Sequence, residues 1–115
     1  MAEPTIDLAT FDELKETAGS DFVMELVDTF LAEAPLLLDE LRRSYAKREA
    51  DTFRRAAHSL KSNGNTFGAH TLSAMAKELE LTGIAPVVQA NGQPLETLAQ
   101  EYARVAAALT ELRNA

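Results

Sequence analysis

The chain contains no cysteine. This absence excludes a disulfide framework, a thiol nucleophile and a thiolate metal site, and it fits a reducing compartment. The chain also lacks an excess of basic residues. It has 11 Lys and Arg and 18 Asp and Glu, which give a formal net charge of −7 at pH 7. Nucleic-acid binding requires a basic face, so we expect no nucleic-acid partner, although a local basic patch remains compatible with these totals.

Targeting and membrane signals are also absent from the sequence. The opening stretch MAEPTIDLATF has neither the basic segment nor the apolar segment of a signal peptide. No stretch reaches the roughly 18 apolar residues that a membrane span needs. We therefore expect a soluble, cytoplasmic protein without a membrane partner.

Helical periodicity is the main positive signal. The 115 residues suffice for one domain, spanning 1–115, with a single core. Strand-like alternation of useful length is missing, whereas apolar residues recur at helical spacing almost throughout. Long amphipathic helices joined by short turns predict an all-α fold, namely an antiparallel four-helix bundle with a short additional N-terminal helix.

Capping residues suggest where the first helices begin and end. A short helix is expected over 11–17, with Thr10 as its N-cap and Gly19 as its stop. Ser20 is expected to cap a second helix. Pro35 either kinks that helix or starts a new one at its first turn.

The later boundaries follow from the same signals. Asp51 is the expected N-cap of a helix over 52–67, and a further helix is expected over 69–81. The segment 84–93 contains Pro, Asn and Gly and is interpreted mainly as a loop. Pro94 suits the first turn of a last helix that runs nearly to the end of the sequence.

One helical stretch, AAHSLKSNGNTFGAHTL at 56–72, is unusually rich in small and polar residues. On a helical wheel, its helix has a core face made of Phe53, Ala56, Ala57, Leu60, Gly64 and Phe67. His58 lies about 140° from the centre of this face. We therefore expect the imidazole to point outward from the bundle.

The neighbours of His58 distinguish it from an exposed helical histidine without function, which is the alternative interpretation. Arg54, Lys61 and Ser62 lie three or four positions away and should surround the ring. Nearby cations favour the neutral, nucleophilic imidazole, and they would stabilise an anion such as a phosphoryl group. Ser62 and Asn65 are small, so a bulky partner could approach.

Glu80 is a candidate for orienting the ring. It lies on a flank of the next helix, about 80° from the centre of the apolar stripe. If the two helices pack antiparallel, Glu80 can accept a hydrogen bond from one ring nitrogen of His58 and leave the other free. Otherwise Glu80 is a solvated carboxylate. Close helix packing is the favoured explanation for Gly64, and His70 is expected to be an exposed first-turn residue.

A short pattern joins these positions. AHSLK occupies 57–61, Gly68 follows the histidine by ten residues, and Leu79-Glu80 ends the next helix. In these features the chain resembles the histidine-containing phosphotransfer (HPt) domain family of multistep two-component signalling. The similarity covers about 20–82, and the last helix matches only in its amphipathic character.

The resemblance implies a role for each residue of the pattern. His58 would be the phosphoacceptor, Lys61 would steady the phosphoryl oxygens, and Glu80 would hold the imidazole. Gly68 would keep the docking surface clear, and Lys77 would add a second positive charge near the phosphoryl group.

Ser62 departs from the family pattern, which usually has glycine directly after the motif lysine. A hydroxymethyl group is small, so we expect access to His58 to be retained. Arg54, Ser62 and Asn65 are assigned, with Gly68, to receiver docking or to the phosphoryl environment.

The resemblance also implies partners. These are receiver domains of hybrid histidine kinases and of response regulators, whose aspartates would exchange a phosphoryl group through a phosphohistidine. We expect no cofactor on this chain and Mg²⁺ on the receiver, because the sequence has no clustered carboxylate site. It has no Gly-rich phosphate loop either, which predicts a phosphocarrier without an ATP site rather than an enzyme. A single acceptor site works in a monomer.

Two alternatives remain open at this point. The chain could be a non-catalytic helical adaptor that binds a receiver or a kinase without phosphotransfer. A metal site is disfavoured, because His58 and His70 are twelve residues apart and no HxxxH spacing occurs. The initiator Met and the compact length favour a free-standing protein over a piece of a hybrid kinase.

Overall fold

The computed structural model describes residues 5–114. This part of the chain is helical and contains no β-strand, which confirms the all-α class. In chain order, the helices are α1 (Leu8–Ala18), α2 (Ser20–Lys47), α3 (Ala50–Thr66), α4 (His70–Thr82), α5 (Ala85–Gln89) and α6 (Gln93–Asn114). The expected domain span 1–115 also includes residues 1–4 and 115, which lie outside the described part.

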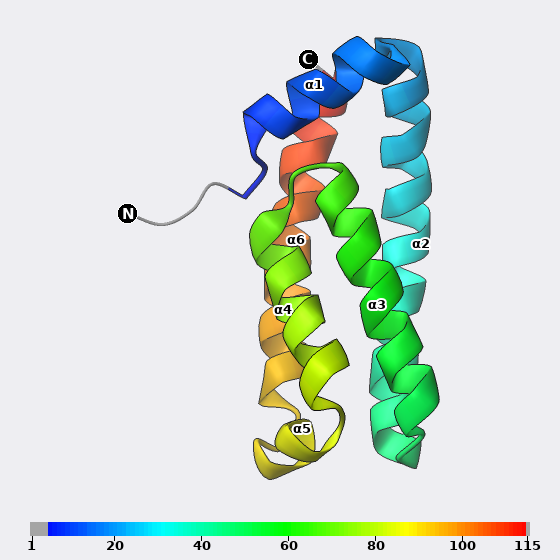
Figure 1. Ribbon diagram of the computed structural model, residues 1–115, viewed down its shortest axis with the longest axis vertical. Helices are drawn as coiled ribbons and strands as arrows, with labels where there is room; N and C mark the ends of the chain where they lie inside the picture. Colours follow the sequence, from blue (N-terminus) through cyan, green and yellow to red (C-terminus); the bar gives the residue numbers. More distant parts are fainter. Residues whose placement is uncertain (1–4, 115) are drawn as a thin grey trace.

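Four long helices form the body of the molecule. Figure 1 shows α2, α3, α4 and α6 running along the long axis, each antiparallel to the next along the chain. The short α1 lies across one end of the bundle, and α5 lies at the opposite end between α4 and α6. The predicted four-helix bundle with an additional N-terminal helix is therefore confirmed.

Buried apolar side chains of the described residues form one cluster between these helices. All six positions of the predicted core face on α3 and the turn after it are buried. Phe30 of α2 links the elements through its ring, which lies 5.4 Å from the Phe67 ring and 5.9 Å from the Tyr102 ring, centroid to centroid. Such aromatic pairs contribute about 0.5–1.5 kcal/mol each beyond area burial.

The start of α1 differs from the prediction. The helix begins at Leu8, and its N-cap is Asp7, whose carboxylate accepts a hydrogen bond from the Ala9 N–H at 3.1 Å. Thr10 lies inside the helix and donates its hydroxyl to Asp7 at 3.0 Å. Both residue types favour N-caps, and the earlier one takes the position here. The predicted end at Gly19 is confirmed.

Two further expected caps are wrong. Gly19, with φ of 90°, precedes α2 as its N-cap, so Ser20 is already the first helical residue. At the start of α3 the N-cap is Glu49, and no side chain caps the helix. Asp51 lies in the first turn and pairs with Arg54 at 3.4 Å. A carboxylate there still interacts favourably with the helix dipole.

The structure also decides between the two alternatives for Pro35 and corrects the expectation for the segment 84–93. α2 continues through the exposed Pro35, which therefore does not start a new helix. The expected loop 84–93 contains the short helix α5, which has Pro86 in its first turn and the buried Val87 facing the core. Burial of this one apolar side chain is a tertiary effect that local composition does not show. Pro94 lies in the first turn of α6, as predicted.

Candidate functional site

His58 lies near the middle of α3 with its side chain 58% exposed. Ala57 and Leu60, on either side of it in sequence, are completely buried. The helical period turns these apolar neighbours toward the core and the imidazole away from it. The predicted outward position of His58 is therefore confirmed.

Glu80 of α4 bridges two side chains of α3. Its Oε2 lies 2.7 Å from Nδ1 of His58, and its Oε1 accepts a hydrogen bond from Nζ of Lys61 at 2.8 Å. The Glu80 side chain is only 18% exposed, so it is not a solvated surface carboxylate. The expected contact between Glu80 and the ring is present because α4 packs antiparallel beside α3 (Figure 1).

The charge state of Glu80 decides which ring nitrogen is available. The hydrogen bond from Lys61 lowers the pKa of the Glu80 carboxyl most strongly, partial burial opposes this, and the bond to His58 lowers the pKa further. An ionised carboxylate only accepts hydrogen bonds, so Nδ1 of His58 must carry the proton. In the neutral ring, Nε2 then holds the free lone pair.

Lys61 makes a contact that the sequence interpretation did not anticipate. Its ammonium binds Glu80, and its side chain is only 24% exposed. The ammonium group has three N–H donors, so this bond leaves donors for an incoming anion.

Two hollows flank the His58 ring. One, of about 550 Å³, opens between α2 and α3 and is lined by Glu33, Leu36, Leu37, His58, Ser59, Ser62 and Asn63. The other, of about 420 Å³, is lined by Arg54, Arg55, His58, Ser59 and Glu80. Leu36 is 66% exposed, so the first hollow has an apolar edge open to solvent.

Several residues of these hollows were missed by the sequence interpretation. Arg55 and Ser59 are close to His58 in sequence, so their helical positions could have indicated them. Glu33, Leu36 and Leu37 come from α2, and no local pattern shows which part of α2 lies beside His58.

The other predicted site residues divide into two groups. Arg54 and Ser62 line the hollows beside His58. Asn65 and Lys77 are exposed but line neither hollow.

Gly68 does not occupy the position that a docking surface requires. It is buried with φ of +80°, and a Cβ added there would lie 2.9 Å from the Asp7 carbonyl oxygen and 3.0 Å from Cβ of Thr10. Its carbonyl accepts a hydrogen bond from the Asp7 N–H at 2.9 Å. The expected role of keeping a surface clear is therefore replaced by a turn against the N-terminal segment.

The remaining small or polar positions behave as expected. Gly64 is buried, and a Cβ there would lie 2.5 Å from Oγ of Ser73, which confirms close packing of α3 against α4. His70 is the exposed first residue of α4, and its Nε2 lies 3.4 Å from a carboxylate oxygen of Asp7.

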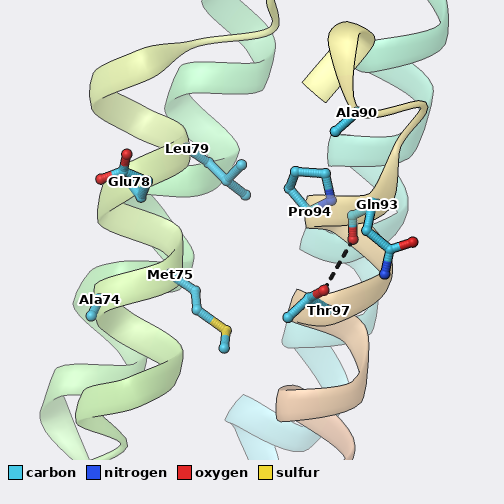
Figure 2. Close-up of a pocket in the computed structure, with 8 residues that line it drawn as sticks. All are labelled: Ala74, Met75, Glu78, Leu79, Ala90, Gln93, Pro94 and Thr97. Carbon is cyan, nitrogen blue, oxygen red and sulfur yellow. Dashed lines mark hydrogen bonds between the residues drawn. The ribbon is translucent and has the colours of Figure 1, made fainter. Parts of the chain in front are cut away.

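A third hollow, of about 480 Å³, lies away from His58. Figure 2 shows side chains of α4 on one side and, on the other, Ala90 and residues at the start of α6. Its lining residues are Ala74, Met75, Glu78, Leu79, Ala90, Gln93, Pro94 and Thr97. It shares no residue with the hollows beside His58, so it is separate from the His58 site.

Two negative findings concern residues 5–114. Within this range, no three or more His, Cys, Asp or Glu side chains come together in a way that could hold a metal ion. No helix in the same range is long and apolar enough to cross a membrane.

The sequence model of the Hpt domain matches residues 25–115. The chain belongs to the Hpt domain family. Its fold agrees with this assignment: histidine-containing phosphotransfer protein B of Pseudomonas aeruginosa PAO1 superimposes with a TM-score of 0.88 at 26% identity. That match covers 98% of this chain and 97% of the other.

Two further proteins are similar to this chain over more than half of its length. Sensor protein TorS of Escherichia coli K12 is 30% identical over 78 residues, which are 68% of this chain, and the chain spans 8% of the length of TorS. The HPT domain of the Hpt sensor hybrid histidine kinase from Shewanella shares the fold, with a TM-score of 0.70 at 18% identity and coverage of 92% and 95%.

Membership of the Hpt domain family indicates a general function. Hpt domains are phosphotransfer proteins of multistep phosphorelays, and they interact with receiver domains and hybrid kinases. They are phosphocarriers rather than classical enzymes.

Proposed function

We propose that this Hpt domain carries a phosphoryl group on His58 between the aspartates of two receiver domains, one in a hybrid histidine kinase and one in a response regulator. The observation that carries the proposal is the 2.7 Å contact between Glu80 Oε2 and Nδ1 of His58. It assigns the ring proton to Nδ1 and leaves Nε2 as the nucleophile on an exposed side chain.

The transfer forms one bond and breaks one bond at phosphorus, and no group is oxidised or reduced. The Nε2 lone pair attacks the phosphorus of the receiver's aspartyl phosphate, the N–P bond forms as the P–O bond breaks, and the aspartate carboxylate leaves with the electron pair. The proton stays on Nδ1, so the phosphorylated ring is cationic, and the Glu80 carboxylate stabilises it. When a second aspartate attacks the phosphorus, the N–P electron pair returns to Nε2.

Positive charge near the ring favours this chemistry. Lys61 keeps Glu80 ionised and retains donors for the phosphoryl oxygens. Arg54 and Arg55 line a hollow that His58 also lines, so they can offset the charge of an arriving phosphoryl group. Ser62 lines the hollow on the other side of the ring, where a small residue leaves room for a receiver.

The remaining parts of the proposal concern conditions of transfer. Mg²⁺ is assigned to the receiver partner, because phosphoryl transfer from aspartate needs a cation and this sequence offers no clustered carboxylates. The absence of a Gly-rich phosphate loop supports a carrier that takes no phosphoryl group from ATP.

We also propose a monomer, since one acceptor site suffices, and a cytoplasmic location, which the cysteine-free composition supports.

The alternative is an adaptor that binds a receiver without phosphotransfer. The family assignment and the relatives do not favour it. The geometry is also unnecessary for an adaptor, because simple docking needs no carboxylate on Nδ1 of His58.

The test is phosphoryl transfer from a panel of phosphorylated receivers to the wild type, to His58→Gln and to His70→Gln. We expect an acid-labile, alkali-stable label on the wild type and on His70→Gln, none on His58→Gln, and none on any variant from ATP alone. Circular dichroism should show equal helicity for the three proteins. A folded wild type that no receiver labels would contradict the proposal and leave the adaptor.

A further inference from the structure

Two side chains of α4 bind the same residue of α3. Oγ of Ser73 donates a hydrogen bond to the backbone carbonyl of Lys61 at 2.9 Å, and Oε1 of Glu80 accepts one from Nζ of Lys61 at 2.8 Å. Ser73 and Glu80 are seven residues apart, or about two helical turns, so they project from nearly the same side of α4. Lys61 is thus held at its backbone and at the end of its side chain by one helix.

Gly64 makes the first of these contacts possible. A Cβ on Gly64 would lie 2.5 Å from Oγ of Ser73, closer than packed atoms approach. The Ser73 hydroxyl therefore occupies the space that a side chain on α3 would take. Glycine in a helix interior is unfavourable by itself, so its presence here is explained by this close approach.

We propose that Ser73, seated on Gly64 and bonded to the Lys61 carbonyl, is a positioning residue that sets the register of α4 on α3 and so places Glu80 against His58. This inference rests on the proposed phosphotransfer function. Ser73 is 3% exposed, and its hydroxyl bonds to the Lys61 carbonyl rather than to the ring, so it acts through the placement of α4 and Glu80.

The helical geometry shows why register matters. A slip of α4 by one residue moves Glu80 about 1.5 Å along the axis and turns it about 100° around it. The turn directs Glu80 away from His58 and Lys61, which its carboxylate contacts at 2.7 Å and 2.8 Å. The ion pair of Lys61 and Glu80 cannot define the register alone, because both side chains are long and adapt by rotation. The short Ser73 side chain bonded to backbone has little such freedom.

The chain offers a matched control in Ser44 of α2. Ser44 is 2% exposed, and its hydroxyl donates to the Glu40 carbonyl at 2.7 Å and to the Leu41 carbonyl at 3.2 Å, within its own helix. Ser44→Ala therefore removes a buried serine hydrogen bond without loosening one helix from another.

The experiment compares Ser73→Ala with Ser44→Ala in the full chain. Nitrogen-15 NMR of the His58 ring reports its tautomer and its pKa, and the rate of transfer is measured from a receiver that labels the wild type. For Ser73→Ala we expect a reduced Nδ1–H population and a rate lower by roughly tenfold, because a misplacement of about 1 Å costs on the order of 100-fold and loss of one hydrogen bond should displace Glu80 by less than that. For Ser44→Ala we expect the wild-type tautomer and a rate within about twofold of the wild type.

Two further variants complete the test. Gly64→Ala should displace Ser73 and give the same NMR change, and it serves as the readout if Ser73→Ala does not fold. Ser73→Thr keeps the hydroxyl and should restore the tautomer at least in part. A wild-type tautomer, pKa and rate in Ser73→Ala would overturn the positioning role. Because the NMR readout needs no receiver, failure of the phosphotransfer proposal would be seen separately, as an unlabelled wild type.

Discussion

Lys61 and Glu80 belong to different helices, yet Nζ and Oε1 lie 2.8 Å apart beside the His58 ring. The resemblance to the family implied that Lys61 contacts phosphoryl oxygens, which stays a prediction; in the structure Lys61 binds the carboxylate that also contacts His58. The Lys61 ammonium therefore lowers the pKa of the Glu80 carboxyl, which in turn contacts the imidazole. This arrangement leads to the first prediction.

Replacing Lys61 by Met should raise the pH at which the protein unfolds on acidification. Lys61 is the largest cause that holds the pKa of Glu80 below its ordinary value of 4.5. A lowered folded-state pKa gives stability that is present above the ordinary value and lost as the pH falls through the folded value. Without Lys61 the folded pKa of Glu80 lies closer to 4.5, so this stability is smaller, and its loss on acidification is complete at a higher pH. Thermal melts from about pH 3 to 7 measure the change.

Lys77→Met is the control for that experiment, because it removes the same charge from an exposed position of α4. No ion pair joins Lys77 to another side chain within the described residues. Melting curves of the Lys61 and Lys77 variants that run parallel over the whole pH range would contradict the coupling of Lys61 to Glu80.

Reversing the charge of Arg55 should slow transfer in a salt-dependent way. Arg55 lines the hollow beside His58 and Glu80, and an exposed cation there attracts the anionic phosphorylated site of a receiver. We expect Arg55→Glu to lower the transfer rate roughly tenfold at low ionic strength, with the difference shrinking toward 1 M salt, where screening acts within about 3 Å.

Lys15→Glu controls for net charge, since it makes the same reversal on α1, at the end of the bundle away from the α5 turn (Figure 1). Equal effects of the two reversals would show that total charge matters and that the hollow does not.

Gly68→Ala should destabilise the fold and leave the chemistry intact. A left-handed conformation costs an L-residue about 1–2 kcal/mol. The new Cβ would also lie 2.9 Å from the Asp7 carbonyl oxygen, which adds to the loss. Urea unfolding measures the stability, and receiver labelling under folding conditions measures the activity.

Gly92→Ala separates the two contributions to that loss. Gly92 has a similar φ of +81°, but a Cβ there would meet only the Tyr45 ring at 3.6 Å, an ordinary contact. We expect Gly68→Ala to lose more stability than Gly92→Ala. A variant at Gly68 that is stable but transfers slowly would instead support the original docking role.

Local periodicity determined much of this protein in advance. The spacing of apolar residues predicted the four long helices, the buried face around Leu60 and the outward ring of His58, because burial follows the 3.6-residue period of each helix. The flank position of Glu80 on its helix and the Leu79-Glu80 pattern singled it out as a candidate partner of the ring, and the structure contains this contact. Glycine and proline also indicated several element ends, such as the stop at Gly19.

Relations between helices were decided only by the tertiary structure. Lys61 binds Glu80, Ser73 packs on Gly64, and part of α2 lines the hollow beside the ring, although no local pattern encodes any of these contacts. The buried Gly68 was misinterpreted for the same reason, since the segment that covers it comes from the start of the chain. A sequence shows the face each helix buries, but register depends on which side chains fit between two helices, and that is settled only when they pack.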